Sequence, residues 1–366
     1  MSLLHPIITP VGKTNSKSAV EIRRFEGMEL AAQIARLESY VALREPLPLS
    51  YHPAWLTVLQ KGLHHIPYCL EAVENGKTRG FLPLAYVRSL LFGRFLVSLP
   101  YLNYGGMIAD DGTIAARLLD SAVELAEQLD VRYLELRHQS AIANPLLSEC
   151  ITHKVLMHRE LPDSPGKLWD ELSAKVRNQV RNGQKKGLSI AWGRHDLLSE
   201  FYIVFCRNMR DLGTPAYGWR LFAAVLDQFA ERAELCVARI GDRPVAAAML
   251  LHGWGVTEVP SASSLRQFNH TNANMLMYWH LLERAVLRKQ RFFDFGRSTR
   301  DSNTFRFKQQ WGATPLPADW QYHLRKGQIS DMRPDNPNYR RLIAFWRKLP
   351  VSITRWIGPT IVRGIP

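Results

Sequence analysis

Apolar residues recur every three or four positions in three parts of the chain, a spacing that places them on one face of a helix. These parts are residues 30–41, 114–129 and 275–289. The pattern predicts three amphipathic helices, and a shorter helix is expected at residues 54–61.

Shorter apolar runs bounded by turn residues predict two β-hairpins. The first covers residues 68–87 around Asn75-Gly76, and the second covers residues 235–251. Asn-Gly is favoured in tight hairpin turns because both positions tolerate positive φ. We also interpret residues 98–107 as a strand that ends in a Tyr-Gly-Gly turn.

The order of these elements repeats along the chain at an offset of 159 residues. Residues 132–136 and 291–295 each follow a predicted helix, and both strands carry an acid at the same place, Glu135 and Asp294. Any α/β protein offers helix–strand pairs of this size, so coincidence is the alternative. The hairpin that recurs at nearly the same offset favours a duplicated α/β (α+β) domain.

The repeat and the composition along the chain divide it into four predicted segments. Residues 1–20 contain prolines and a polar run and are expected to form a flexible arm. The first domain is expected at residues 21–158 and the second at residues 159–330. Residues 331–366 are expected to form a basic amphipathic helix.

The charge and the cysteines restrict the possible partners and the compartment. A net charge of +14 and a pI near 9.8 indicate a surface that attracts polyanions such as nucleic acid, anionic lipid or phosphorylated carriers. The four cysteines form no CxxC pair or zinc-type cluster, which indicates neither a disulfide framework nor a structural metal. Residues 1–20 contain no apolar run of signal-peptide length, and no window elsewhere reaches the roughly 18 uncharged apolar residues of a membrane span. We therefore expect a cytoplasmic protein that does not cross a membrane.

A basic stretch at residues 175–186 contains no acid. Several of its cations recur every four residues and would form one stripe on a helix: Lys175, Arg177, Arg181, Lys185 and Lys186. Such a stripe suits a phosphate backbone or another anionic carrier. A solvated helical face is the alternative, although such faces usually mix positive and negative charges.

Residues 338–366 combine helical apolar spacing with arginines and lysines and lack acids. Basic helices that contain Trp lie well on anionic membrane surfaces. A helix docked on the protein's own core is the competing interpretation. Pro350 is expected to kink the helix in either case.

The stretch 292–312 is the richest in candidate chemistry. It begins as an aromatic strand, breaks at Gly296 and continues into donors and cations that a purely packing element does not need. Its candidates for holding a substrate or stabilising an oxyanion are Arg297, Ser298, Thr304, Arg306 and Lys308. An extended segment at residues 304–308 would place Arg306 and Lys308 on one face.

Other candidate groups are fewer. Asp294 is a possible base, although an acid paired with a neighbouring arginine is the commoner explanation. The segment Tyr101–Gly106 offers Tyr101, Asn103 and Tyr104 as donors beside aromatic faces, and a tight turn without a ligand explains it about equally well. No Ser-His-Asp set and no histidine ligand spacing is present.

These residues carry a resemblance to a known family. The pattern FDFGRS…TFRFKQQWGA at residues 293–313, preceded by a helix from Asn272, resembles the FemAB family. Within the family it is similar to the FemAB-like proteins that accompany exosortase/PEP-CTERM systems in bacteria with exopolysaccharide clusters. The basic stretch 175–188 also looks like the family's Arg- and Lys-rich segment at the start of the second domain.

The resemblance implies a fold and a chemistry. FemAB proteins are built from two GNAT-like domains, here each expected to be a mixed twisted sheet flanked by helices. Characterised members pass an aminoacyl group from aminoacyl-tRNA to an amine of a peptidoglycan precursor, without a metal or a bound cofactor. The family's Phe-Lys pair matches Phe307-Lys308, so Lys308 would stabilise the oxyanion.

The resemblance also implies roles for residues of the first domain, but the chain departs from the family in two respects. The first domain would hold the acceptor near Tyr101, Asn103 and Tyr104, and Tyr278 in the preceding helix joins the substrate-binding candidates. No coiled-coil arm for tRNA is apparent in the sequence. The glycine-rich loop with which GNAT enzymes hold the pyrophosphate of acetyl-CoA is not evident either, which speaks against that donor but not against another acyl-CoA or a carrier protein.

Three hypotheses follow from the sequence. The first is a FemAB-like acyl or aminoacyl transferase that forms an amide or ester bond on a cell-envelope or exopolysaccharide-related acceptor near the inner membrane. The second is a non-catalytic tandem GNAT-like protein that binds an anionic carrier or nucleic acid at the membrane. The third is an acyl-CoA-dependent N-acyltransferase. In the first and third, the donor is a co-substrate, either aminoacyl-tRNA or an acyl-CoA or acyl carrier.

Overall fold

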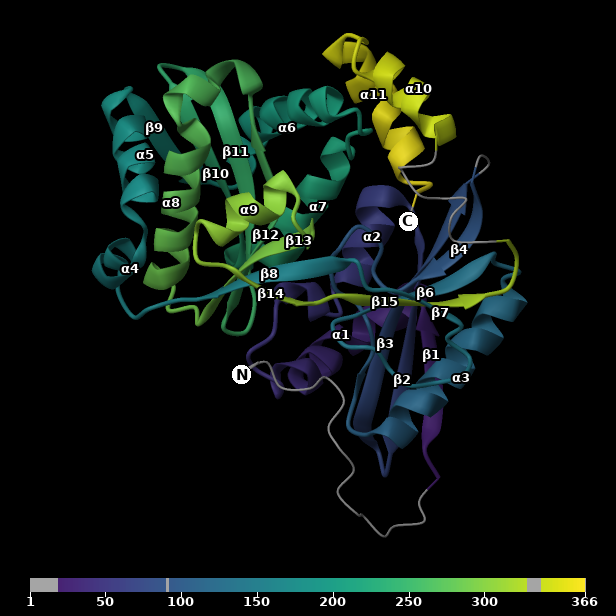
Figure 1. Cartoon of the computed structure of the whole chain (residues 1–366). Helices are drawn as coiled ribbons and strands as arrows, with labels where there is room; N and C mark the ends of the chain where they lie inside the picture. The colour runs from purple at the N-terminus through teal and green to yellow at the C-terminus, as the bar shows by residue number, and fades with distance from the viewer. Residues whose placement is uncertain (1–18, 90–91, 328–336, 366) are drawn as a thin grey trace.

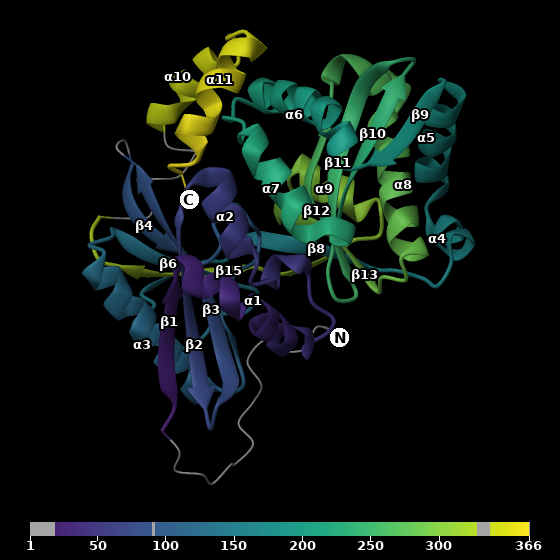
Figure 2. The ribbon, with the colours of Figure 1, turned by 180° about the vertical axis from the view of Figure 1, so that it is seen from behind.

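The computed structural model describes residues 19–89, 92–327 and 337–365. The predicted arm at residues 1–20 therefore lies almost entirely outside the described residues. The chain forms two mixed β-sheets with helices on both faces of each sheet, and Figures 1 and 2 show the two sheets side by side. The predicted α/β fold, with two mixed sheets flanked by helices, is confirmed.

The first sheet is built mainly from the first half of the chain. Its strands run in the order β1 (Glu21–Glu26), β2 (Ile66–Glu74), β3 (Lys77–Ser89), β4 (Gly93–Val97), β6 (Tyr133–His138), β15 (Asp319–Leu324) and β7 (Glu149–Ile151), with β5 (Ile108–Ala109) beside β3. The predicted hairpin around Asn75-Gly76 is the β2–β3 pair.

The second sheet is built from the second half of the chain and one earlier strand. Its order is β14 (Thr314–Pro317), β8 (Lys154–Glu160), β13 (Phe292–Thr299), β12 (Val256–Ser264), β11 (Arg243–His252), β10 (Ala233–Ile240) and β9 (Leu188–Gly193). The second predicted hairpin is the β10–β11 pair.

The internal repeat predicted from the sequence corresponds to a repeated arrangement of strands. Each sheet contains one parallel pair, β4 with β6 and β12 with β13. The second strand of each pair follows a long helix, α3 (Gly112–Gln128) or α8 (Ala273–Leu287). Glu135 and Asp294 occupy the third ladder position of their pairs, opposite Val97 and Glu258.

The two sheets exchange strands across the predicted domain boundary. β8 lies before residue 159 for most of its length, yet it pairs with β13 of the second sheet. β15 lies near the end of the predicted second domain, yet it pairs with β6 of the first sheet. The predicted domains 21–158 and 159–330 therefore do not coincide with the two sheets. The first sheet takes β15 from the predicted second domain, and the second sheet takes most of β8 from the predicted first domain.

Helices fill the space between the sheets. α1 (Gly27–Ala42), α2 (Trp55–Leu63), α6 (Leu198–Leu212) and α7 (Trp219–Phe229) share one core that contacts both sheets. α3 covers the other face of the first sheet. α4 (Pro165–Glu171), α5 (Ala174–Lys185) and α8 cover the other face of the second sheet. The shared core makes the two halves one packed unit.

Gly62 sets the close approach of α2 and α7. A Cβ atom at this position would lie 2.8 Å from the Cα of Leu221, too close for any side chain. The contact between α2 of the first half and α7 of the second therefore depends on a residue without a side chain.

Two local predictions were wrong. Residues 98–107 do not form a strand, because β4 ends at Val97 and the following loop takes positive φ at Leu99 and Tyr101. Residues 304–308 are not extended but belong to helix α9 (Asn303–Gln309), which begins after the capping residue Ser302. The Ser302 Oγ accepts a hydrogen bond from the Phe305 backbone N–H, at 3.2 Å, and so fixes the helix start.

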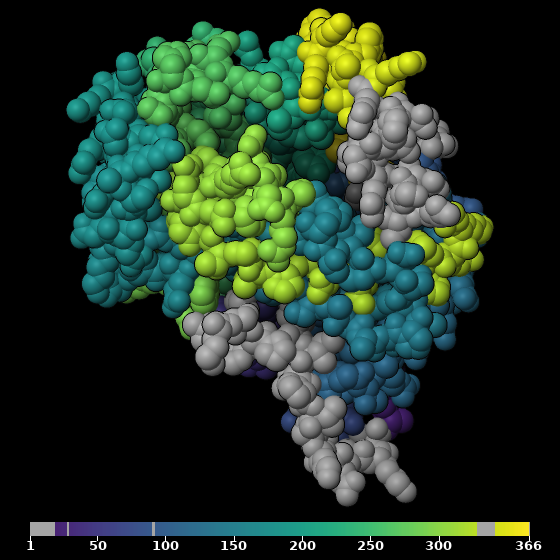
Figure 3. Space-filling model, viewed as in Figure 1, coloured from purple at the N-terminus to yellow at the C-terminus, as the bar shows by residue number. Residues whose placement is uncertain are grey.

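The C-terminal region forms two helices separated at Pro350, α10 (Pro337–Trp346) and α11 (Val351–Val362). They pack over the junction of the two halves, where Arg210 donates a hydrogen bond to the Leu349 carbonyl and Tyr101 donates one to the Arg363 carbonyl. Figure 3 shows the surface hollowed between these helices and the second half of the chain. None of the helices in the described part of the chain is long and apolar enough to span a membrane.

Candidate functional site

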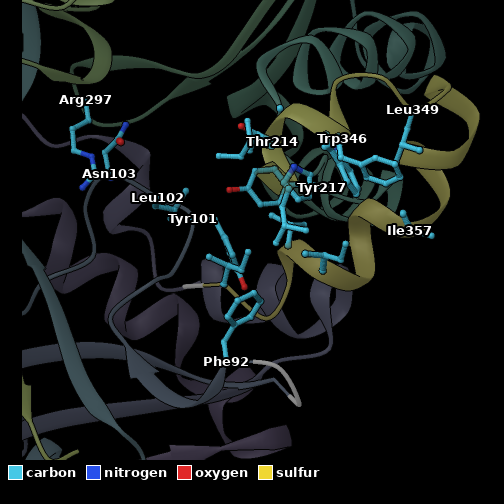
Figure 4. Close-up of a pocket in the computed structure, with 18 of the residues that line it drawn as sticks. Phe92, Tyr101, Leu102, Asn103, Thr214, Tyr217, Arg297, Trp346, Leu349 and Ile357 are labelled. Atoms are coloured by element: carbon cyan, nitrogen blue, oxygen red, sulfur yellow. The ribbon is translucent and has the colours of Figure 1, made fainter. Parts of the chain in front are cut away.

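A cavity of about 660 Å³ lies where the two halves and the C-terminal helices meet. One end is formed by Asn103 and Arg297, and the other end by the inner sides of α10 and α11, as Figure 4 shows. The first domain contributes Tyr101 and Leu102, and the second contributes Tyr217. Its volume is within the range of small-molecule sites, and most of its lining is apolar.

Lys308 does not line the cavity, but it is hydrogen-bonded to the backbone of Arg297, whose side chain does. Its side chain is 9% exposed, and its Nζ donates hydrogen bonds to the carbonyls of Gly296 and Arg297, both at 3.0 Å. Burial lowers the pKa of Lys308 to about 8, and the negative charge of Asp294 acts in the other direction, to raise it. An ammonium has three N–H donors, so one remains beyond these two carbonyls.

The helical conformation of α9 separates two residues that we expected on one face. Lys308 points to the bend of β13, whereas Arg306 is exposed. Phe307 packs edge-on against Tyr278, with ring centroids 4.9 Å apart. Tyr278 is buried and stacks on Phe295, so it supports the strand that carries the site and does not line the cavity.

The bend at Gly296 is held by a buried polar cluster that spans both halves. The Asp294 Oδ1 accepts a hydrogen bond from the Gly296 N–H at 2.7 Å and lies 3.4 Å from the His158 Nε2. The Tyr104 hydroxyl is hydrogen-bonded to the same His158 nitrogen at 2.5 Å. Burial acts to raise the pKa of Asp294, but the charge of His158 and its hydrogen bonds hold it below its ordinary value.

Glu258 lies beside Asp294 in the parallel strand pair. Its carboxylate accepts two hydrogen bonds from Ser50, of the first domain. Burial, followed by the charge of Asp294, raises the pKa of Glu258 to about 8. Asp294 and Tyr104 thus position β13 and join the halves, and neither lines the cavity.

Two arginines share the ring of Trp320 at the polar end of the cavity. The Cζ atom of Arg297 lies 3.4 Å from the ring centroid and that of Arg137 lies 4.0 Å from it. Arg137 is paired with Glu135 at 2.7 Å. Arg297 makes no side-chain hydrogen bond or ion pair within the described residues, and burial together with the charge of Arg137 lowers its pKa to about 10.

The remaining candidate residues have different surroundings in the structure. Ser298 is buried, and its Oγ has no hydrogen-bond partner among the described residues. Thr304 is exposed and bonded to Ser302. Tyr101 lines the cavity, but its hydroxyl is already engaged by His65 and by the Arg363 carbonyl.

The basic stripe lies on another part of the second domain. Lys175, Arg181, Lys185 and Lys186 are exposed on α5 or just after it, and Arg177 is half-buried. α5 packs against α8, at the left edge of Figure 1, whereas the cavity lies beside the C-terminal helices. A smaller cavity of about 280 Å³ lies at the start of α8, close to Gly183 near the end of α5.

Sequence reasoning missed Arg137, Trp320, His158 and Glu258. Arg137 follows the repeated strand directly, and that position was the available indication of its importance. Nothing in the sequence indicated that Trp320 belongs to the site, because it reaches Arg297 only through the pairing of β15 with the first sheet. In the described part of the chain, no cluster of His, Cys, Asp and Glu is suited to a metal ion.

The chain resembles known proteins in its second half and in its overall fold. Residues 173–309, from the start of α5 to the end of α9, match the family model of the acetyltransferase (GNAT) domain. Comparison with curated proteins gave no match.

Three solved structures have a similar fold over most of the chain. FemX is 13% identical, with a TM-score of 0.59 over 88% of this chain and 100% of that one. A tandem GNAT protein from the clavulanic acid biosynthesis pathway, without AcCoA, is 13% identical, with a TM-score of 0.54 over 84% and 100%. The C-terminal domain (DUF2156) of a putative lysylphosphatidylglycerol synthetase from Agrobacterium fabrum is 12% identical, with a TM-score of 0.53 over 81% and 93%.

At these identities the likeness to solved structures concerns the fold alone. The likeness extends over both mixed sheets of this chain, since each of the three structures covers more than four fifths of it. The chain therefore has the fold of tandem GNAT-like proteins, and residues 173–309 in its second half match the model of the GNAT acetyltransferase domain.

Proposed function

We propose that the chain is an acyl or aminoacyl transferase that forms an amide or ester bond on a cell-envelope or saccharide-linked acceptor. The observation that carries the proposal is the buried ammonium of Lys308. It donates hydrogen bonds to two backbone carbonyls, one of them that of Arg297, whose side chain lines the cavity shared by both halves. Its third N–H donor is available for a further acceptor.

Lys308 suits stabilisation of a tetrahedral intermediate. In the proposed reaction, a nucleophile of the acceptor attacks the donor carbonyl carbon, which forms the new bond and places a negative charge on the carbonyl oxygen. The donor's leaving group then departs with its bonding electrons and receives the proton that the nucleophile loses. A preorganised cation in a buried site stabilises that oxyanion by about 3 to 4 kcal/mol, or a factor of about 10² to 10³ in rate.

The sequence resemblance of residues 293–313 to the FemAB family supports an aminoacyl donor. On α5, the exposed cations are not joined to acids within the described residues, and the smaller cavity at the start of α8 lies near the end of that helix. We place an anionic donor, aminoacyl-tRNA or an acyl carrier, on this side of the second domain, and the acceptor in the larger cavity. Association with exosortase/PEP-CTERM systems and exopolysaccharide assembly remains a prediction from the sequence resemblance.

The C-terminal helices support peripheral attachment of a cytoplasmic protein to an anionic membrane. Phe345 is 63% exposed and Trp356 is 81% exposed, with Arg347, Lys348 and Arg355 exposed beside them. Trp356→Ala should weaken binding to vesicles that contain phosphatidylglycerol, whereas Leu287→Ala, on the exposed end of α8, should not. Equal vesicle binding by both variants would exclude this surface.

The test of the transferase proposal compares Lys308→Met with the wild-type chain in a transfer assay. Charged tRNA pools and acyl-CoAs serve as donors, and lipid-linked and nucleotide-linked saccharides serve as acceptors. Loss of about 10² to 10³ in rate is expected for Lys308→Met, with an unchanged circular dichroism spectrum. Unchanged turnover would remove Lys308 from the mechanism, and absence of transfer with every donor would favour the binding-protein hypothesis.

A third possibility, the acyl-CoA-dependent N-acyltransferase, is separated by calorimetry. Tight binding of acetyl-CoA or a longer acyl-CoA to the smaller cavity would favour it over an aminoacyl-tRNA donor. Salt-dependent binding of tRNA with no acyl-CoA binding would favour the reverse.

A further inference from the structure

The larger cavity is amphipathic from end to end. Its polar end carries Arg297, Arg137 and Asn103, and the Trp320 ring lies beneath both guanidinium groups. Its walls then become apolar, and the far end is formed almost wholly by hydrocarbon side chains of the C-terminal helices: Leu342, Ile343, Phe345, Leu349, Ile357 and Ile361.

The polar end has one uncompensated positive charge. Arg137 is neutralised by Glu135 and also donates a hydrogen bond to the Leu102 carbonyl, at 2.7 Å. Arg297 has no acidic partner and no side-chain hydrogen bond within the described residues, although its side chain is largely buried. A partly buried guanidinium without an acceptor is costly, and a planar bidentate anion would satisfy it.

The apolar end opens toward the surface through side chains that are unusually exposed for their type. Leu342 and Phe345 both line the cavity and are both 63% exposed. Apolar side chains at the rim would let a hydrocarbon chain pass from a lipid phase into the cavity without contact with water.

We propose that this cavity binds a lipid with a phosphate headgroup, whose phosphate lies on Arg297 and whose hydrocarbon chain lies against α10 and α11. One occupant accounts for the lone cation, the apolar walls and the exposed apolar rim together. The assignment of this lipid as the transfer acceptor rests on the proposed function, whereas its binding does not. Because Lys308 is bonded to the carbonyl of Arg297, the headgroup would lie beside the proposed reacting centre.

The test measures binding of dodecyl phosphate to the full chain by tryptophan fluorescence, because Trp320 and Trp346 both line the cavity. Concentrations stay below those at which the probe forms micelles. Octyl phosphate should bind more weakly, since each methylene buried contributes about 0.8 kcal/mol, up to about fourfold in affinity. Dodecanol and inorganic phosphate should each bind more weakly than dodecyl phosphate.

Arg297→Gln should weaken dodecyl phosphate binding at least about tenfold, because a charge-assisted bidentate contact is lost. Arg297→Lys, which keeps the charge, should retain more affinity than Arg297→Gln. Arg117→Gln, an equal change of charge on the exposed side of α3, is the matched control and should bind normally.

The proposal is overturned if the affinity is independent of chain length, if Arg297→Gln binds as the wild type does, or if dodecanol binds as tightly as dodecyl phosphate. The wild-type chain-length series needs no variant and so stands even if Arg297→Gln fails to fold. Chain-dependent binding that persists in a Lys308→Met chain without transfer activity would support the lipid site, whether or not the lipid proves to be the acceptor.

Discussion

Lys308 is expected to make the stability of the chain depend on pH, and Lys308→Met should remove that dependence. In the folded chain the amine is buried with a pKa of about 8, below its ordinary value of 10.5. Between these two values the unfolded chain binds more protons at this group than the folded chain does. The free energy of unfolding contributed by Lys308 therefore rises with pH in this window.

The size of the effect follows from the two pKa values. The gap between about 8 and 10.5 corresponds to about 3.4 kcal/mol for the full titration. Between about pH 7 and about pH 9.5, roughly 2 kcal/mol of it should appear. No large correction for solvent screening is needed, because the side chain is only 9% exposed.

The assay is urea unfolding followed by circular dichroism at both pH values. Other groups titrate in the same range, so the quantity to compare is the stability difference between wild type and Lys308→Met. That difference should shift by about 2 kcal/mol in favour of the wild type as pH rises. Lys61→Met, at an exposed lysine on α2, should show no such shift. A constant difference, or one that moves toward the variant, would refute the buried-ammonium description of the site.

Three other predictions concern packing, capping and charge. Gly62→Ala should lower the free energy of unfolding by about 1 to 3 kcal/mol, because the new Cβ would meet the Leu221 backbone. A lower melting temperature would show this. Gly112→Ala is the control and should be tolerated, because a Cβ at Gly112 meets nothing within 4 Å. Ser302→Ala should cost about 1 kcal/mol through loss of the α9 cap, and Ser302→Thr should recover most of it; equal melting temperatures would contradict the capping role. Arg181→Gln should lower the salt dependence of any RNA binding by about 0.7 in the log–log slope, and an unchanged slope would show that α5 does not contact RNA.

Local sequence patterns predicted most of the helices and strands whose formation depends on residues close together in the chain. The amphipathic helices, the two hairpins and the repeated strand all appear near their predicted places, because periodicity and turn residues act within a few positions. α9 was missed because its aromatic and basic residues alternate as in a strand, while the cap at Ser302 and the burial of Phe305 and Lys308 favour a helix.

The site was predictable only in part, for a physical reason. Arg297 and Lys308 lie in one continuous stretch, so their clustering is visible in the sequence. Trp320 and Arg137 come together only when β15 pairs with β6, and no local pattern specifies that pairing. The uncompensated charge of Arg297 likewise depends on Glu135 being engaged by Arg137, a contact within the other half of the chain.

The exchange of strands has a consequence for how the site is assembled. β13, α9 and β15 supply Arg297, Lys308 and Trp320 in one run of chain. Arg297 belongs to the second sheet and Lys308 to a helix beside it, whereas Trp320 belongs to the first sheet. The Trp320 ring can therefore lie against Arg297 only while the two halves are docked through their shared core and the Tyr104–His158 contact. Separation of the halves would move the ring away from the guanidinium and open the polar end of the cavity. In this arrangement the interface that stabilises the fold is also the structure that completes the site, so substitutions that loosen the interface should weaken ligand binding before they unfold either sheet.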